Sequence, residues 1–212
     1  MKKTAVVFGA TGLVGKTLVN LLASDERYDK VIQVVRNQSD IVHPKIHTII
    51  LADYSKLHQY KIMLAADDYF CCIGTTIKKA GSKKAFRSVD LKIPEYIAHL
   101  AGELSVPNLV IVSSIGADAQ SRNFYLRTKG EMEVSVRNIY HGHLKFVRPS
   151  LLIGNRTEFR PAERFSIVMM KLVGWTMVGP LRKYRGIQVN KVASEMIRAT
   201  EDTSPSVFIE FN

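Results

Sequence analysis

Tyr125 and Lys129 stand four residues apart, and Ser113 and Ser114 precede them by a short segment. If residues 122–140 are helical, the phenol and the ammonium lie one turn apart on the same face. A free tyrosine has a pKa near 10, so acid–base work near neutral pH needs that pKa lowered by about 3, equivalent to about 4 kcal/mol. A neighbouring ammonium favours the phenolate, and a serine hydroxyl can hold a substrate oxygen. The pattern predicts proton-transfer chemistry, although an exposed Tyr and Lys on an amphipathic helix have the same spacing.

A glycine-rich turn at residues 9–15 (GATGLVG) predicts a cofactor site that would accompany the proton transfer. It follows the apolar run Ala5–Phe8 and opens an apolar-periodic helix. Gly9 permits a tight turn, Gly12 lets backbone N–H groups approach a pyrophosphate, and Gly15 lets helix and strand pack closely. This strand–turn–helix context predicts a bound dinucleotide at the helix N-terminus rather than a merely structural turn. The expected contacts are Gly9, Thr11, Gly12, Leu13, Val14 and Gly15.

Arg36 indicates which dinucleotide is bound. It follows the expected strand Val31–Val35 and stands twenty-one residues after Gly15, where an NAD site usually offers a carboxylate to the ribose. An arginine here favours the 2′-phosphate of NADP(H) over NAD(H), with a solvated arginine as the alternative. Asp53, after the third expected strand, is placed either to accept from the adenine amino group or to cap the following helix.

Alternating apolar runs and helix-period segments indicate the elements that must position these groups. Several runs lack polar alternation, as strands buried on both faces require. Helices are expected at 12–23, 55–65, 89–104, 122–140 and 190–201. This order predicts an α/β fold with a doubly wound, mostly parallel, Rossmann-like sheet in a single domain, residues 1–212. The expected strands are Ala5–Phe8, Val31–Val35, Thr48–Leu51, Tyr69–Cys72, Leu109–Val112, Leu144–Val147 and, at one edge, Val207–Phe211.

Residues 154–186 interrupt the alternation with glycines and prolines around an apolar helix near 162–173. Because ligands bind outside the carboxyl ends of such strands, this small irregular segment is expected to form a substrate lid. Its apolar run Phe165–Gly179 could pack on the core, roof the substrate or form a homodimer surface, and the first two are favoured. The run is too short to span a bilayer, so no membrane span is expected.

Composition narrows the partners and the compartment. The net charge is +11, but the basic residues are spread along the chain, so specific nucleic-acid binding ranks below a phosphate-bearing cofactor. Cys71 and Cys72 are the two cysteines and cannot form a disulfide framework. The N-terminal apolar run is interpreted as a strand rather than a secretory signal, so we expect a cytoplasmic protein. No metal site is expected, because His141 and His143 are better explained by a helix C-terminal turn.

Clustered basic residues suggest an anionic small-molecule substrate, with ordinary solvated charge as the alternative. The basic residues are Lys78, Lys79, Lys83, Lys84, Arg156, Arg160, Arg182 and Arg185.

Two acidic residues of the expected helix 122–140, Glu131 and Glu133, are expected to be solvated. Arg148, which follows the expected strand Leu144–Val147, is expected to anchor local structure through an ion pair or carbonyl contacts.

Longer blocks of sequence carry a family resemblance. These blocks are CCIGTTIKKAGS at 71–82, SSIGA at 113–117, FYLRTKGEME at 124–133, RPSLLIGNRTEFRP at 148–161 and GPLRKYR at 179–185, together with the glycine turn. The chain resembles the short-chain dehydrogenase/reductase superfamily over nearly its whole length. More narrowly, it is similar to the atypical subgroup that contains the Tat-interacting protein and its bacterial oxidoreductase relatives.

This resemblance implies hydride transfer between a nicotinamide and a small carbonyl or alcohol substrate. Tyr125 is then the acid/base, and Lys129 holds the nicotinamide ribose and lowers the Tyr125 pKa. Ser114 best matches the catalytic serine, with Ser113 as second choice, although the spacing of eleven residues to Tyr125 is shorter than in many members. The resemblance adds as cofactor contacts Cys72, Ile73, Gly74 and Thr75 on the adenosine side and ribose, and Pro149, Ser150 and Leu151 along the nicotinamide.

A non-catalytic NADPH-binding sensor or scaffold that acts through a protein partner is the alternative function. Some members of the atypical class bind NADPH without established turnover. Both functions need Gly12 and Arg36, but only the enzyme needs Tyr125.

Overall fold

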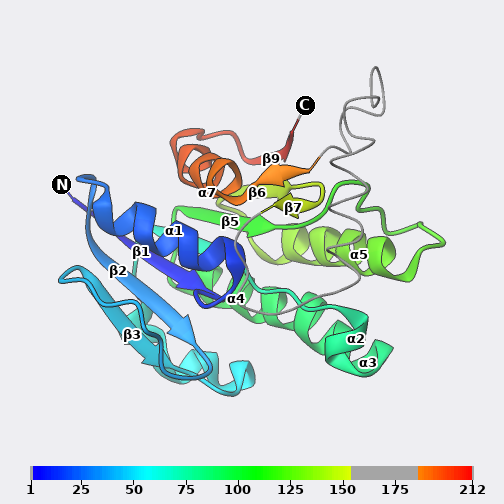
Figure 1. Ribbon diagram of the computed structural model, residues 1–212, viewed down its shortest axis with the longest axis horizontal. Helices are drawn as coiled ribbons and strands as arrows, with labels where there is room; N and C mark the ends of the chain where they lie inside the picture. Colours follow the sequence, from blue (N-terminus) through cyan, green and yellow to red (C-terminus); the bar gives the residue numbers. More distant parts are fainter. Residues whose placement is uncertain (1, 154–185, 212) are drawn as a thin grey trace.

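Parallel strands form the central sheet of the computed structural model, which describes residues 2–153 and 186–211. The seven-stranded sheet has the order β3-β2-β1-β4-β5-β6-β9, and its neighbouring strands pair in parallel (Figure 1). The carboxyl ends of the strands therefore share one edge, and the expected doubly wound fold is confirmed. The strands are β1 (Lys3–Phe8), β2 (Tyr28–Val35), β3 (Ile46–Ile50), β4 (Asp68–Cys71), β5 (Asn108–Val112), β6 (His143–Arg148) and β9 (Ser206–Glu210).

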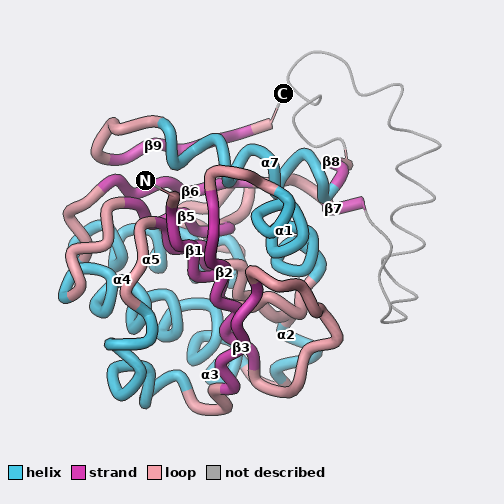
Figure 2. Tube along the Cα trace, turned by 90° about the vertical axis from the view of Figure 1, so that its left-hand side faces the viewer, coloured by secondary structure: helices cyan, strands magenta, loops and turns pink. Residues whose placement is uncertain are grey.

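Helices cover both faces of the sheet (Figures 1 and 2). Along β1, Val6 and Phe8 face the core beneath α4 and α5, whereas Ala5 and Val7 face the core beneath α1 and α7. All four residues are fully buried, as a strand without polar alternation requires. The principal helices are α1 (Leu13–Ser24), α4 (Ile93–Glu103), α5 (Phe124–Ile139) and α7 (Val189–Arg198).

The segment after β3 is a 3₁₀ helix, Tyr54–Leu64, rather than the expected α-helix. Its buried side chains are Tyr54, Leu57 and Leu64. Tyr54 and Leu57 are three residues apart, the spacing that aligns side chains on a 3₁₀ helix. Because so narrow a stripe reaches the core, an α-helical face is not required here.

Two short helices, α2 (Ile77–Ala80) and α3 (Lys83–Arg87), follow β4 where no helix is expected from the sequence. The π-helical turn Ser88–Lys92 then leads directly into α4. Pro94 lies in the first turn of α4, where a missing N–H is tolerated, so it marks a helix start and not a kink.

A small second sheet joins the parts of the chain that precede and follow residues 154–185. β7 (Leu152–Ile153) pairs in parallel with β8 (Ile187–Gln188). Apart from Gly186, the expected lid, residues 154–186, and its apolar helix lie outside the described residues, so the lid stays a prediction. None of the helices within 2–153 and 186–211 is long and apolar enough to cross a membrane.

Arg148 of β6 contacts α5, β9 and the loop after β5, and its ion pair with Glu133 corrects the expectation for that residue. The Arg148 guanidinium donates to Glu133 at 2.6 and 2.9 Å, and Glu133 is buried on α5 rather than solvated. The same group reaches Glu210 on β9 at 3.2 Å and the Ala117 carbonyl at 3.4 Å. Arg148 therefore anchors local structure, as the sequence predicts.

At the amino ends of the strands, the buried carboxylate of Asp68 connects β4 with β1, β2 and β5. Asp68 accepts hydrogen bonds from the Tyr28 phenol at 2.6 Å, the Asn108 amide at 2.7 Å and Lys3 Nζ at 3.2 Å. Burial and this carboxylate raise the pKa of Tyr28. The network lies far along the strands from the loops that carry the candidate site, so its role is in stability.

We expect Asp68→Ala to lower the free energy of unfolding by about 3 kcal/mol, because it leaves the Tyr28 and Asn108 polar groups buried without their partner. Urea denaturation followed by circular dichroism measures the change. Glu103→Ala is the control, since it removes only exposed pairs with Lys61 and His58 and should change stability little. Equal stability of the Asp68 variant and the wild type would contradict a structural role for the network.

Candidate active site

The turn between β1 and α1 forms a backbone cradle. Gly9 has a φ of +79°, and a Cβ on it would lie 2.9 Å from the Cys72 carbonyl. A Cβ on Gly15 would lie 2.2 Å from the Gly9 oxygen, which confirms the close packing of helix and strand. Gly12 precedes α1 without a capping side chain, and the first turn carries no acidic residue. The amides at the positive end of α1 therefore suit an anionic group such as a pyrophosphate.

Loops from neighbouring strands meet beside this cradle. The Cys72 amide donates to the Phe8 carbonyl at 2.9 Å, so the loop after β4 starts next to the glycine turn. The Ile115 amide donates to the Pro149 carbonyl at 3.1 Å, which joins the loops after β5 and β6. Four of the expected segments are thus brought to one edge of the sheet: the cradle, residues 72–75, the serine loop after β5 and residues 149–151.

Arg36 and Asp53 lie further along the same edge, after β2 and β3. Arg36 is exposed at the strand end. The Asp53 carboxylate accepts the Ser55 amide at 3.0 Å and therefore caps the 3₁₀ helix. Contact of either residue with a cofactor stays a prediction.

The first two turns of α5 carry the Tyr–Lys pair. The Asn123 side chain accepts the amides of Tyr125 and Leu126 and so fixes the start of the helix. Tyr125 is half-buried, and its ring packs against Phe86 of α3 with centroids 5.9 Å apart. One turn later Lys129 is buried, with 5% of its side chain exposed. The helical spacing expected from the sequence is confirmed.

Asp90, in the π-helical turn, is the counter-ion of Lys129. The Asp90 Oδ1 atom lies 2.9 Å from Lys129 Nζ. Burial acts to lower the pKa of Lys129, but the charges of Asp90 and Tyr125 outweigh it and raise that pKa above its usual value. Asp90 belongs to no sequence motif and was not predicted as a site residue. Its one signal was an acidic residue on the apolar stripe of the expected helix 89–104, shared with Ile97 and Ala101.

The two candidate serines differ in their surroundings. Ser113 is buried at the end of β5, and its hydroxyl has no hydrogen-bond partner. Ser114 is half-buried and donates to the Ile115 carbonyl at 3.2 Å. Among the described residues, the buried side-chain atoms without a hydrogen bond are Ser113 Oγ and Asp90 Oδ1, the latter in its ion pair. The unused Ser113 hydroxyl, at the carboxyl end of β5, fits a site that takes a polar ligand.

The loop after β5 crosses α5 at Gly130, which explains the short spacing between the serines and Tyr125. A Cβ on Gly130 would lie 2.2 Å from the Ala119 nitrogen. The Asp118 amide also donates to the Leu126 carbonyl at 3.2 Å. Since the loop rests directly on the helix, eleven residues are enough to reach from Ser114 to Tyr125.

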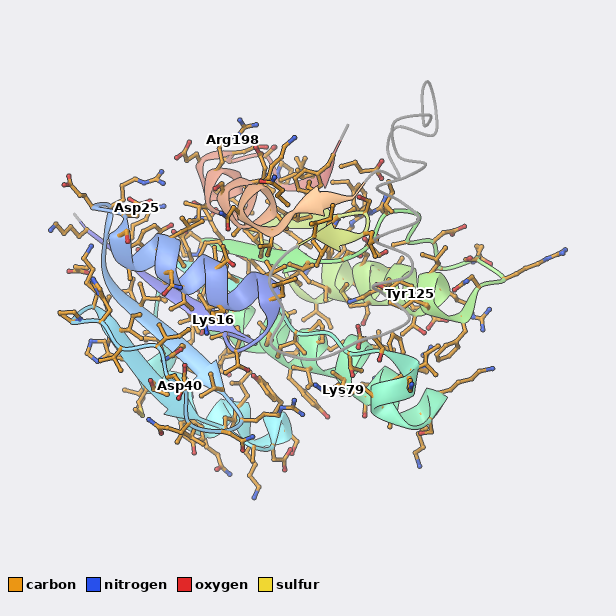
Figure 3. The ribbon with its side chains drawn as sticks, in the orientation of Figure 1. Lys16, Asp25, Asp40, Lys79, Tyr125 and Arg198 are labelled. Atoms are coloured by element: carbon orange, nitrogen blue, oxygen red, sulfur yellow. The ribbon has the colours of Figure 1, made fainter. Side chains whose placement is uncertain are left out.

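The cysteines and lysines near the site have less specific surroundings. Burial raises the pKa of Cys71 to about 11, and that of Cys72 also rises, so both thiols stay protonated. Cys71 is buried and Cys72 is half-buried. Lys79, labelled with Tyr125 in Figure 3, lies on α2, and Lys83 Nζ lies 5.3 Å from the centre of the Phe124 ring. The anionic substrate stays a prediction, and the four arginines expected with these lysines lie outside the described residues.

Similarity to known proteins agrees with this geometry. Residues 9–157 match the model of the NAD(P)H-binding family. The chain belongs to that family. The mitochondrial protein FMP52 of Lodderomyces elongisporus is 30% identical over 191 residues, which cover 85% of this chain and 80% of that protein. Protein HTATIP2 of Rattus norvegicus is 32% identical over 164 residues, covering 76% and 67%. The resemblance to the Tat-interacting-protein subgroup is confirmed.

Solved structures share the fold of this NAD(P)H-binding family member. The Bordetella bronchiseptica enzyme WbmH, in complex with NAD⁺, has a TM-score of 0.75 at 14% identity over 100% of this chain and 76% of its own. The dTDP-4-dehydrorhamnose reductase of Bacillus anthracis, in complex with NADP, has a TM-score of 0.69 at 16% identity, with the same coverage. The fold is therefore that of NAD(P)-binding oxidoreductases.

The expectation of a cytoplasmic protein is wrong. The FMP52 proteins of Lodderomyces elongisporus, Candida albicans and Scheffersomyces stipitis are all named as mitochondrial. A low cysteine content indicates a reducing environment but does not distinguish one reducing compartment from another.

We expect Gly130→Ala to lower the free energy of unfolding by about 1–3 kcal/mol, because the added methyl group collides with the backbone of the serine loop. Gly102→Ala on α4 is the matched control. Its nearest contact would be the Ile139 oxygen at 3.9 Å, so the gain in helix propensity should stabilise the protein by up to about 1 kcal/mol. Urea denaturation compares the two variants. Stabilisation by both would show that the loop does not rest on α5.

Proposed function

We propose that the chain is an NADP(H)-dependent oxidoreductase that moves a hydride between nicotinamide C4 and the carbonyl or alcohol carbon of a small substrate. The observation that carries this proposal is the Lys129 ammonium, buried and paired on α5 one helical turn from the half-buried Tyr125 phenol. Both groups lie beside the edge where the glycine cradle opens. Family membership and the fold support the cofactor class.

The cradle is the part of the chain that would hold the cofactor phosphates. The amides near Thr11 to Val14 bind the pyrophosphate, and the absence of a capping side chain and of acidic residues there supports this assignment. The segments Cys72–Thr75 and Pro149–Leu151 line the ribose and the nicotinamide. Lys129 donates to the hydroxyls of the nicotinamide ribose.

Tyr125 and the side chains around it carry out the acid–base catalysis. The bound nicotinamide supplies the hydride in reduction and accepts it in oxidation. In reduction, the Tyr125 phenol gives its proton to the substrate oxygen, which leaves a phenolate that solvent reprotonates. The Lys129 ammonium stabilises that phenolate, and the hydroxyl of Ser114 or Ser113 donates to the substrate oxygen. Ser113 Oγ has no partner in the structure, which supports a role for it in this contact.

Replacement of Tyr125 by Phe tests the reaction directly. It keeps the ring against Phe86 and removes only the hydroxyl. We expect NADPH affinity, measured by quenching of protein fluorescence, to stay within about threefold of the wild type, since the phenol is not an anchor for the cofactor. We expect turnover of carbonyl substrates to fall by about 10²–10⁴-fold, the usual contribution of a positioned acid.

A cellular phenotype of the wild type decides between catalysis and the non-catalytic alternative. If Tyr125→Phe binds NADPH and abolishes turnover together with the phenotype, the enzyme is supported. If the phenotype survives this substitution but is lost in Gly12→Asp, which blocks the cradle, the chain acts as a cofactor-dependent sensor or scaffold instead.

The preference for NADP(H) depends on Arg36. We expect Arg36→Ala to weaken NADPH binding by about tenfold or more through loss of a charge-assisted contact, while NADH binding stays unchanged. Arg198→Ala is the control, because it removes one exposed positive charge from α7, remote from the cradle. Calorimetric titration of both cofactors gives the comparison. An equal loss for NADH and NADPH would assign Arg36 a role other than 2′-phosphate recognition.

A further inference from the structure

Asp90 is a buried acid to which the proposed reaction gives no role. It is 1% exposed and lies in the π-helical turn between α3 and α4. Such turns are rare and frequently occur at functional sites, since the extra residue re-aims a side chain out of the helical register. Burying a carboxylate is costly unless it is paired, so the position of Asp90 needs an explanation.

The two carboxylate oxygens of Asp90 have different partners from different elements. Oδ1 lies 2.9 Å from the Lys129 ammonium on α5. Oδ2 accepts the Thr75 amide, in the loop after β4, at 2.8 Å. A Cβ on exposed Gly74 would lie 3.4 Å from Asp90 Oδ1 and 3.9 Å from Lys129 Nζ. The backbone of this loop therefore lies close to the ion pair.

The charge of Lys129 depends on this carboxylate. The ionisable groups that act on Lys129 are Asp90 from the π-helical turn, Tyr125 from its own helix and Cys71 from the end of β4. Burial keeps the Cys71 thiol neutral, and of these three groups Asp90 is the one whose carboxylate forms an ion pair with Lys129, at 2.9 Å. Asp90 is therefore the group that supplies negative charge to the buried ammonium. Without it, desolvation would drive Lys129 towards the neutral amine.

We propose that Asp90 is a positioning residue: its carboxylate keeps the Lys129 ammonium charged and joins it to the Thr75 amide, so that α5 and the loop after β4 hold the nicotinamide ribose as one unit. This inference rests on the proposed function, in which Lys129 contacts the cofactor.

Asp90→Asn isolates the charge, because asparagine has the same shape and keeps an oxygen for the Thr75 amide. The first measurement uses the protein without cofactor. Acetic anhydride labelling between pH 7 and 10, followed by peptide mass spectrometry, reports the fraction of neutral Lys129 amine. We expect the Lys129 labelling rate to rise at least tenfold in the variant, since lowering the pKa of an amine by one raises its neutral fraction about tenfold.

The second measurement is NADPH affinity over pH 7–9.5, where the cofactor phosphates stay ionised. In the wild type we expect no titration from Lys129 in this range, because its pKa is raised. In Asp90→Asn we expect the affinity to fall as pH rises, as the ammonium that donates to the ribose loses its proton. The decline should be at least threefold between pH 7 and 9.5.

Glu133→Gln is the matched control. Glu133 is also a buried carboxylate in an ion pair, 2.6 Å from Arg148, and lies on α5 one turn beyond Lys129. Its replacement should change neither Lys129 labelling nor the pH dependence of NADPH affinity. Asp90→Glu keeps the charge, so it should label slowly and bind without a pH slope. This variant tests the proposal even if Asp90→Asn does not fold.

The outcomes separate this proposal from the function on which it rests. Unchanged Lys129 labelling in Asp90→Asn, or an affinity loss of the same size at every pH, would make Asp90 a structural residue and overturn the proposal. Faster labelling without a pH slope in affinity would also overturn it, because Asp90 would not act on the cofactor through Lys129. A folded wild type that does not bind NADPH would instead overturn the proposed function and leave the effect on labelling intact.

Discussion

The close approach of Gly15 to the Gly9 carbonyl is the constraint on which the site depends, because no side chain fits between them. It sets the start of α1 at the carboxyl edge of β1, where its first amides point outwards. Gly9 in turn contacts the Cys72 backbone, which places the loop after β4. That loop carries Thr75, whose amide donates to Asp90. One series of contacts thus runs from the glycine turn to the Asp90–Lys129 ion pair.

The two edges of the sheet serve different purposes. At the amino edge, Asp68 has three hydrogen-bonding partners. At the carboxyl edge, the Ser113 hydroxyl has no hydrogen-bond partner among the described residues, and Lys129 is a buried charge paired with the Asp90 carboxylate. Polar groups that are satisfied only when a ligand is bound reduce the stability of the free protein. The parallel sheet makes this separation possible, since every strand leads from the stabilised edge to the binding edge.

The sheet and the cradle could be predicted from the sequence because each has a local cause. Ala5–Phe8 is apolar throughout, as a central strand must be, and the glycines have spacings that a tight turn requires. The Tyr125–Lys129 spacing needed only that α5 be helical. The short helices α2 and α3 also had local signals that were overlooked, since Thr76 and Ser82 each cap a following turn.

Tertiary pairing could not be inferred in the same way. Glu133 and Asp90 are acidic residues on stripes that face the core, and their cations, Arg148 and Lys129, come from other parts of the chain. Local polarity suggested solvent for Glu133 and gave no role to Asp90. An acidic residue on an apolar stripe is therefore better interpreted as one half of a buried ion pair, whose partner only the fold identifies.

Isothermal titration calorimetry of the folded protein with NADPH and with NAD⁺ tests the central claim most directly. A dinucleotide held across the β1–α1 turn predicts saturable binding at one site per chain, abolished by Gly12→Asp, whose side chain would enter the cradle. Absence of binding by either coenzyme at millimolar concentration, with the protein shown to be folded by circular dichroism, would contradict the account.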